Sequence, residues 1–155
     1  MASRLSLILL ACLVLGSPVL SGVDVTYDPD VDFSFYGTYA WSKGVPAANE
    51  WVEEYIVKIV EGYLEASGLR KVDGGQADLE VTSTVVTQAV SSYSTVFTRG
   101  TLVVNLVDTD SNRSVWQAAG KAQIDEGDWA QRAPEHIKKK IDKVTRKMFR
   151  DFPPF

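Results

Sequence analysis

Residues 79–124 read LEVTSTVVTQAVSSYSTVFTRGTLVVNLVDTDSNRSVWQAAGKAQI, and this stretch decides the fold. It is rich in valine and threonine, whose branched side chains favour extended backbone. Polar residues at 91–95 and 108–112 have the composition of turns and divide it into three runs. The runs are Leu79–Val90, Val96–Asp108 with an interruption at Gly100, and Ser114–Ile124. Because short turns join neighbouring strands as hairpins, the stretch predicts three antiparallel strands.

Two amphipathic segments flank these strands and predict helices. The first, Glu50–Ser67, follows Asn49, a good N-cap residue, and ends before Gly68, a residue typical of helix ends. The second begins at Pro134, which suits a first helical turn. In both, apolar residues recur at steps of three and four. The stripes are Trp51, Val52, Tyr55, Ile56, Ile59, Val60, Tyr63 and Leu64, and then Ile137, Ile141, Val144, Met148, Phe149 and Phe152.

The residues ahead of the first helix add strand signals. Val23–Tyr27 alternates apolar and polar residues, Asp28–Asp30 forms a turn, and Thr38–Trp41 is a short second strand or an extension of the first. We therefore predict an α+β domain with a mostly antiparallel four-stranded sheet, two helices packed on one face, and the order β-α-β-β-β-α.

One face of the last predicted strand is dominated by small residues. Alternation along a strand places every second side chain on the same face. The residues concerned are Trp116, Ala118, Gly120, Ala122 and Ile124. Small side chains there allow a helix to pack close to the sheet.

The first 21 residues have the layout of a secretory signal peptide. A charged start at Arg4 precedes an apolar block, Leu5–Gly16, and the small-residue exit Val19–Ser21. The block has about 12 residues, whereas a membrane-spanning helix needs roughly 20. The alternative is an N-terminal anchor or a buried strand. We expect a signal peptide over 1–21 and a single domain over 22–155, with no transmembrane segment after the signal.

Cys12 is the only cysteine and lies inside the apolar block. Removal of the signal would leave a domain with no thiol, a composition that suits a bacterial envelope. The competing hypothesis is lipidation of Cys12, because Ala11 provides the small residue that precedes a lipidated cysteine. Leu10 is bulky for such a site, so we favour a soluble exported form, in the periplasm or associated with the outer membrane, over a lipid-anchored one.

Two blocks of the chain resemble a bacterial putative-lipoprotein family, domain of unknown function 4136. The first block comprises Tyr27-Asp28-Pro29, Asp32-Phe33, Tyr36, Thr38-Tyr39 and Trp41, and the second comprises Gly100–Val104, Leu106–Asp108 and Val115-Trp116. The resemblance implies an envelope protein with this α+β layout and brings no activity, substrate or catalytic residue. The chain departs from the family in the position of its cysteine and in Asn112, where glycine is common.

The chemistry-bearing residues predict no catalytic residue, metal site or cofactor. His136 is the only histidine, and no nucleophile motif accompanies it, so we interpret it as a surface residue rather than a general base. Asp28, Asp30 and Asp32 alternate as at the start of a calcium loop, but the glycine and glutamate that such a loop needs are missing. A carboxylate-based hydrolase remains a third hypothesis, without a spacing that points to it.

Aromatic side chains crowd into the segment before the first helix. Tyr36, Tyr39 and Trp41 are the candidate ligand-binding residues of this group, because exposed rings could form a groove for a glycan or an apolar ligand. The other interpretation is that the rings fill the core. Large aromatic side chains dominate core energetics, and this favours the second interpretation.

Charge is distributed unevenly along the chain. Residues 134–155 hold seven basic and three acidic side chains, a net charge of +4, while residues 22–133 hold eight basic and 17 acidic side chains, a net charge of −9. A basic amphipathic helix can lie on anionic lipid, or its charges can simply form a solvated face. An acidic body makes nucleic acid an unsuitable partner.

These observations predict a non-catalytic interaction module of the bacterial envelope. Its partner would be an envelope protein, a lipid or a cell-wall component. The alternative is a carrier of a small apolar or glycan ligand that uses the aromatic segment.

Overall fold

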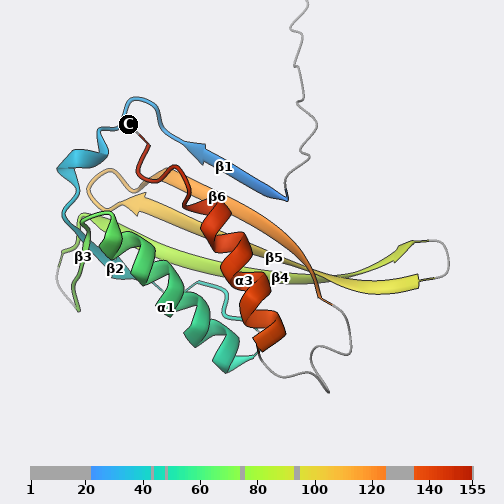
Figure 1. Cartoon of the computed structure of the whole chain (residues 1–155). Helices are drawn as coiled ribbons and strands as arrows, with labels where there is room; N and C mark the ends of the chain where they lie inside the picture. Colours follow the sequence, from blue (N-terminus) through green and yellow to red (C-terminus); the bar gives the residue numbers. More distant parts are fainter. Residues whose placement is uncertain are drawn as a thin grey trace, which may run out of the picture.

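The computed structural model describes residues 22–42, 44–47, 49–73, 76–92, 95–124 and 135–154 (Figure 1). The predicted signal peptide and Cys12 lie outside these residues. The elements in order are β1 (Val23–Tyr27), the 3-10 helix η1 (Phe33–Phe35), β2 (Thr38–Trp41), α1 (Glu50–Ala66), β3 (Arg70–Lys71), β4 (Leu79–Ser92), β5 (Thr95–Asp108), β6 (Arg113–Ile124) and α3 (Glu135–Met148).

The strands form one six-stranded mixed sheet in the order β1-β6-β5-β4-β2-β3. The pairs β1–β6, β6–β5 and β5–β4 are antiparallel, whereas β2 runs parallel to both β4 and β3. The α+β class and the three hairpin strands are confirmed, but the four-stranded description and the order β-α-β-β-β-α are wrong, because two separate strands precede α1 and β3 follows it. β2 does not extend β1, because the two strands lie on opposite sides of the β4–β5–β6 core. The parallel pairing follows from α1, since a helical crossover returns the chain in the same direction.

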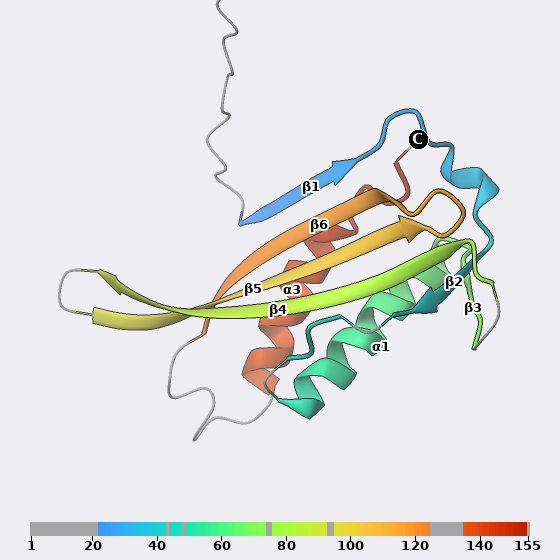
Figure 2. The same ribbon diagram turned by 180° about the vertical axis from the view of Figure 1, so that it is seen from behind.

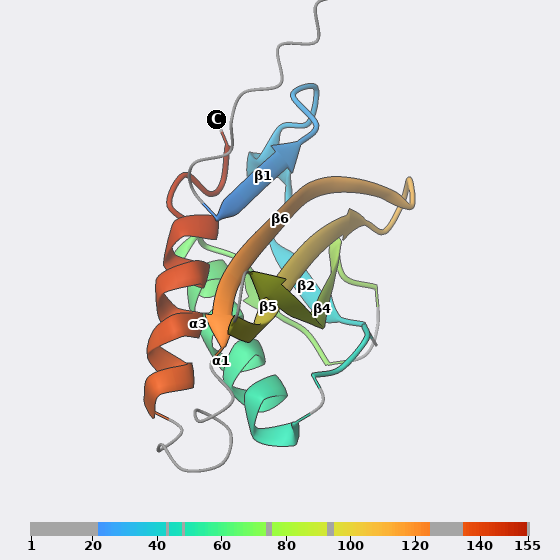
Figure 3. The same cartoon turned by 90° about the vertical axis from the view of Figure 1, so that its right-hand side faces the viewer.

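Both helices lie on the same side of the sheet, as predicted (Figure 3). Four residues at steps of four on α1 are buried against the strands: Val52, Ile56, Val60 and Leu64. The helix ends as expected, because Gly68 adopts a φ of 91°, a conformation that glycine takes without strain. Figure 2 shows the opposite face of the sheet, which no described helix covers.

Gly120 of β6 sets the distance between α3 and the sheet. A Cβ atom on this residue would overlap Cγ1 of Val144 and lie 3.1 Å from the sulfur of Met148. Both partners are buried side chains of α3. The expectation that small residues on this strand admit a close helix is therefore confirmed at Gly120.

An aromatic cluster continues this contact toward the C-terminus. The ring centroid of Trp116 lies 4.9 Å from that of Phe149 and 5.1 Å from that of Phe152. Phe149 also stacks on Tyr63 of α1 at 5.0 Å, and Phe152 meets Phe33 of η1 at 5.9 Å. Trp116 itself is 1% exposed. The cluster thus ties both helices and the N-terminal turn to β6.

Two carboxylates fasten the short β2 strand to the body. Asp78 accepts hydrogen bonds of 2.8 Å from the backbone N–H groups of Gly37 and Thr38 and from the Thr38 hydroxyl. These donors hold the pKa of Asp78 below its usual value. Asp108 accepts hydrogen bonds from the Tyr36 hydroxyl, at 2.8 Å, and from Ser111 in the following turn. In that turn Asn112 takes a φ of 53°, the left-handed conformation in which glycine is common.

β4 and β5 form a long arm that projects past the helices (Figures 1 and 2). Each strand has 14 residues, and they pair continuously from Leu79↔Asp108 to Ser92↔Thr95. The predicted interruption at Gly100 is wrong, because this glycine pairs with Thr87 on one side and Ala122 on the other. The pairing of β5 with β6 is irregular instead at Leu106/Val107, where β6 has one extra residue, Val115.

The contact at Gly120 can be tested by adding one methyl group. Gly120→Ala should lower the free energy of unfolding by about 1–3 kcal/mol, because the new Cβ must displace Val144 or the strand. Gly62→Ala is the matched control, since nothing lies within 4 Å of its added Cβ and α1 gains a better helix former. It should stabilise the protein by about 0.5–1 kcal/mol. Urea unfolding measures both, and a neutral Gly120→Ala would contradict the packing.

The hydrogen bonds that Asp78 accepts at the start of β2 predict that the stability of the protein depends on pH. Asp78→Asn should cost roughly 1 kcal/mol near neutral pH, because the amide replaces a charged acceptor of three hydrogen bonds. The folded-state pKa of Asp78 lies below the ordinary value of 3.8, so its stabilisation is present above that value and is lost as the pH falls through the folded pKa. Urea unfolding at decreasing pH should show the two proteins converging in acid. A constant difference would contradict this role.

Candidate functional site: an apolar cavity between the helices and the sheet

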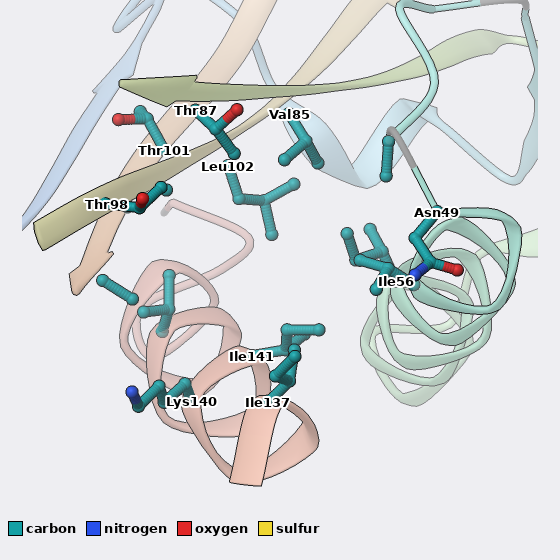
Figure 4. Close-up of a pocket in the computed structure, with 16 residues that line it drawn as sticks. Asn49, Ile56, Val85, Thr87, Thr98, Thr101, Leu102, Ile137, Lys140 and Ile141 are labelled. Carbon is teal, nitrogen blue, oxygen red and sulfur yellow. The ribbon is translucent and has the colours of Figure 1, made fainter. Parts of the chain in front are cut away.

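A cavity of about 260 Å³ lies between the sheet and the N-terminal halves of α1 and α3 (Figure 4). Its floor consists of two rows of paired residues across three strands. The inner row is Val85, Leu102 and Gly120, and the outer row is Thr87, Gly100 and Ala122. The outer row contributes few side-chain atoms, so the space above it stays unfilled.

The two helices form the walls of the cavity. Val52 and Ile56 face it from α1, and Ile137, Ile141 and Val144 face it from α3. In Figure 4, Ile56 approaches from one side and Ile137 and Ile141 from the other, with Leu102 above them. No aromatic side chain is among the described residues that line the cavity.

A polar contact bridges the same two helices. The Tyr55 hydroxyl donates a 2.9 Å hydrogen bond to Asp142. Burial and this carboxylate raise the pKa of Tyr55 to about 12, so the phenol stays protonated as a donor at neutral pH. The ammonium of Lys138 lies 5.4 Å from the centre of the Tyr55 ring. These contacts hold α1 and α3 at a fixed separation alongside the cavity.

The cavity reaches from the core to the surface. Its lining includes buried residues such as Ile56, at 2% exposure, and exposed residues such as Thr87. Side-chain polar groups occur toward the rim, in Thr87 and Thr98, the amide of Asn49 and the end of Lys140. Asn49 precedes α1 but makes no capping hydrogen bond with its side chain.

The cavity opens to solvent at its rim, while its inner part is lined by apolar side chains. The apolar inner part of this space has the chemistry to hold an apolar molecule. No carboxylate, imidazole or thiol is among the described residues that line it.

Tyr36, Tyr39 and Trp41, the residues that the sequence singled out for ligand binding, do not line this cavity. Tyr39 is fully buried in the core, and its hydroxyl has no hydrogen-bond partner among the described residues. Burial, together with the charges of Glu61 and Glu65, raises its pKa to about 12. Trp41 donates a 2.8 Å hydrogen bond from Nε1 to Glu61.

Tyr36 is the third of these residues and lies near the start of β2. Burial and the hydrogen bond to Asp108 raise the pKa of its hydroxyl. The three side chains therefore make separate contacts, with Trp41 alone at the edge of a shallow hollow beside Pro46 and Val57.

The cavity residues carried only a partial signal in the sequence. Gly120 and Ala122 stood out as small residues on one strand face, but only as a packing surface for a helix. Gly100 was interpreted as a break in its strand. That Gly100 and Ala122 lie side by side depends on the register of β5 against β6, which single-strand patterns do not provide.

Ionisable side chains of the described residues form no group of three or more histidine, cysteine, aspartate or glutamate residues that could hold a metal ion. His136 is an exposed residue in the first turn of α3. The described part of the chain contains no helix with both the length and the apolar character needed to cross a membrane.

Solved structures share this fold at low sequence identity. A PDZ domain protein from Parabacteroides distasonis matches with a TM-score of 0.63 and 16% identity over 87% of this chain. The match covers 36% of that protein, so the chain spans about a third of its length. The PelC dodecamer from Paraburkholderia phytofirmans matches with a TM-score of 0.52 and 13% identity, over 81% of this chain and 95% of that one.

A minor lipoprotein from Acinetobacter baumannii also matches, with a TM-score of 0.43 and 16% identity over 75% of this chain and 91% of that one. No curated protein matches the chain. The family model described as a domain of unknown function, DUF4136, matches residues 23–154, from the start of β1 to the end of the described structure. The chain therefore belongs to the DUF4136 family.

Proposed function

We propose that this protein is a non-catalytic interaction module of the bacterial envelope that works by assembling with further copies of itself through the free edge of its β4–β5 arm. The observation that carries the proposal is the unprotected edge of β4. Export is supported by the signal-peptide pattern of residues 1–21.

The edge in question is the outer side of residues 85–92 in β4. β2 pairs with β4 only at Leu79–Val81, and an isolated bridge joins Val45 to Thr84. Beyond Thr84, β4 has β5 as its only strand partner in the described parts of the chain. Every second backbone N–H and C=O group there is directed away from β5, which is the template that another strand needs.

Natural sheets usually protect such edges with charges, proline, bulges or short strands. The β3 edge of this sheet is protected, because it has two residues, Arg70 and Lys71. The β1 edge has five residues and carries Asp24. In the sequence, residues 85–102 include a single charged residue, Arg99, and no proline. Val86 is 45% exposed on this arm.

The comparison with PelC supports assembly as a use of this fold. That protein forms a dodecamer and shares the fold over most of its own length. Asp78 and Asp108 have structural roles, because both accept hydrogen bonds from backbone N–H groups. An edge of uncharged, strand-forming residues favours a second strand as its partner, and a second copy provides an identical one.

The test places charges on the arm. The exported protein should associate beyond the monomer in analytical ultracentrifugation, and Val86→Lys with Val90→Lys should weaken association at least about tenfold, or about 1.4 kcal/mol. The reason is that paired edges would bring like charges together and bury their ammonium groups. Residue 86 is exposed and residue 90 half-exposed, so folding should be retained.

Two controls make this test specific. Val86→Thr with Val90→Thr keeps the edge uncharged and strand-forming, and should leave association nearly unchanged. Thr26→Lys places the charge on the β1 edge instead and should also have little effect. A protein that stays monomeric at all concentrations, or one that Thr26→Lys disrupts as strongly, would contradict the proposal.

A further inference from the structure

We infer that the cavity between α1, α3 and the sheet is a binding site for one unbranched aliphatic chain, supplied by a fatty acid or by a lipid with a single acyl chain. This site is separate from the β4 edge: the edge is the outer side of the arm, and the cavity lies beneath the face of the sheet that the helices cover.

The chemistry of the walls selects an aliphatic ligand. The inner surfaces come from valine, isoleucine, leucine, alanine and glycine side chains, represented by Ile56, Val85 and Ile141. The described residues that line the cavity include no aromatic ring on which a flat ligand could stack. Hydrogen-bonding side chains occur only toward the rim, so a ligand with polar groups along its length would lose hydrogen bonds to water without replacing them.

The course of the cavity suits a chain with one polar end. Buried Ile56 and Leu102 form its inner part, and the hydroxyls of Thr87 and Thr98 lie toward the exposed end of the sheet (Figure 4). An aliphatic tail would fill the inner part, and a carboxylate or glycerol group would remain among the hydroxyls at the rim. Apolar cavities in protein cores stay dry and take up hydrocarbons for the same reason.

The volume sets the length of the chain. A water molecule occupies roughly 30 Å³ in the liquid, and a methylene group is of comparable size. The cavity of about 260 Å³ therefore has room for roughly nine carbon atoms. Each buried methylene should tighten binding about fourfold until the cavity is full, and further carbons should add little.

The experiment uses the protein produced in a bacterial host and purified in its exported form, then stripped of bound lipid. Hexanoic, octanoic, decanoic and dodecanoic acid are titrated by calorimetry in detergent-free buffer, with a lysophospholipid carrying one decanoyl chain as a second probe. We expect saturable binding of one chain per protein, with a rise of about fourfold per methylene that levels off near nine carbons. Binding of the acids alone would identify free fatty acid as the source, and binding of the lysophospholipid alone would identify an acylated lipid.

A matched pair of variants places the ligand. Ala122→Phe projects a ring into the outer row of the cavity floor and should weaken binding at least tenfold. Ala119→Phe adds the same ring to the opposite face of β6, and should leave binding unchanged. Val86→Lys with Val90→Lys should also bind normally, which separates this site from the assembly proposal.

A direct measurement covers the case in which Ala122→Phe fails to fold. Methyl spectra of isoleucine-labelled protein should shift at Ile56, Ile137 and Ile141 on addition of decanoic acid. Ile59, which does not line the cavity, should stay in place. Absence of saturable binding by both probe classes, equal binding to Ala122→Phe, or shifts that spare these three isoleucines would overturn the inference.

Discussion

The close contact of α3 with β6 at Gly120 is the constraint on which the rest of the domain depends. Because this position has no side chain, the side chains of Val144 and Met148 pack directly against the strand backbone. The same helix then places Phe149 and the following Phe152 against Trp116, and through these rings it reaches α1 and η1. One glycine thus fixes the position of the second helix for the whole domain.

The cavity follows from the same arrangement. α3 is anchored near its C-terminal end, where the face of β6 offers Gly120 and the large ring of Trp116. Toward its N-terminal end the helix passes over Gly100 and Ala122, which fill little space, while α1 stands to the side, joined to α3 through Tyr55 and Asp142. The domain packs tightly at one end of α3 and leaves an aliphatic hollow toward the other, and Gly120 and Val144 lie where the two regions meet.

Local patterns in the sequence predicted those parts of the fold that depend on neighbouring residues. The apolar stripes of both helices, the three hairpin strands and the small residues on β6 are all expressed within single segments. The strand signals of β1 and β2 were found, but β3 and the pairing of β2 were missed. β3 has only two residues, and β2 pairs with β4 only after the chain has passed through α1. No periodicity within so short a segment reveals which strand it will join.

The candidate site was missed for a related reason. Aromatic residues such as Tyr39 attract attention in a sequence, but here Tyr39 is part of the core. The cavity exists because Gly100 and Ala122 have little or no side chain and because the register of β5 and β6 sets these positions side by side. The spacing between two strands in the chain does not specify that register, since it depends on the bulge at Leu106/Val107.

A double-mutant cycle on Gly120 and Val144 tests the central contact most directly. If the added Cβ at position 120 collides with Val144, then Val144→Ala should make room for it. The loss of stability in the combined variant should be smaller than the sum of the two single losses by about 1 kcal/mol or more, within the range of coupling found for touching residues. Strictly additive losses in urea unfolding would show that α3 does not rest on Gly120, and would contradict this account of the fold.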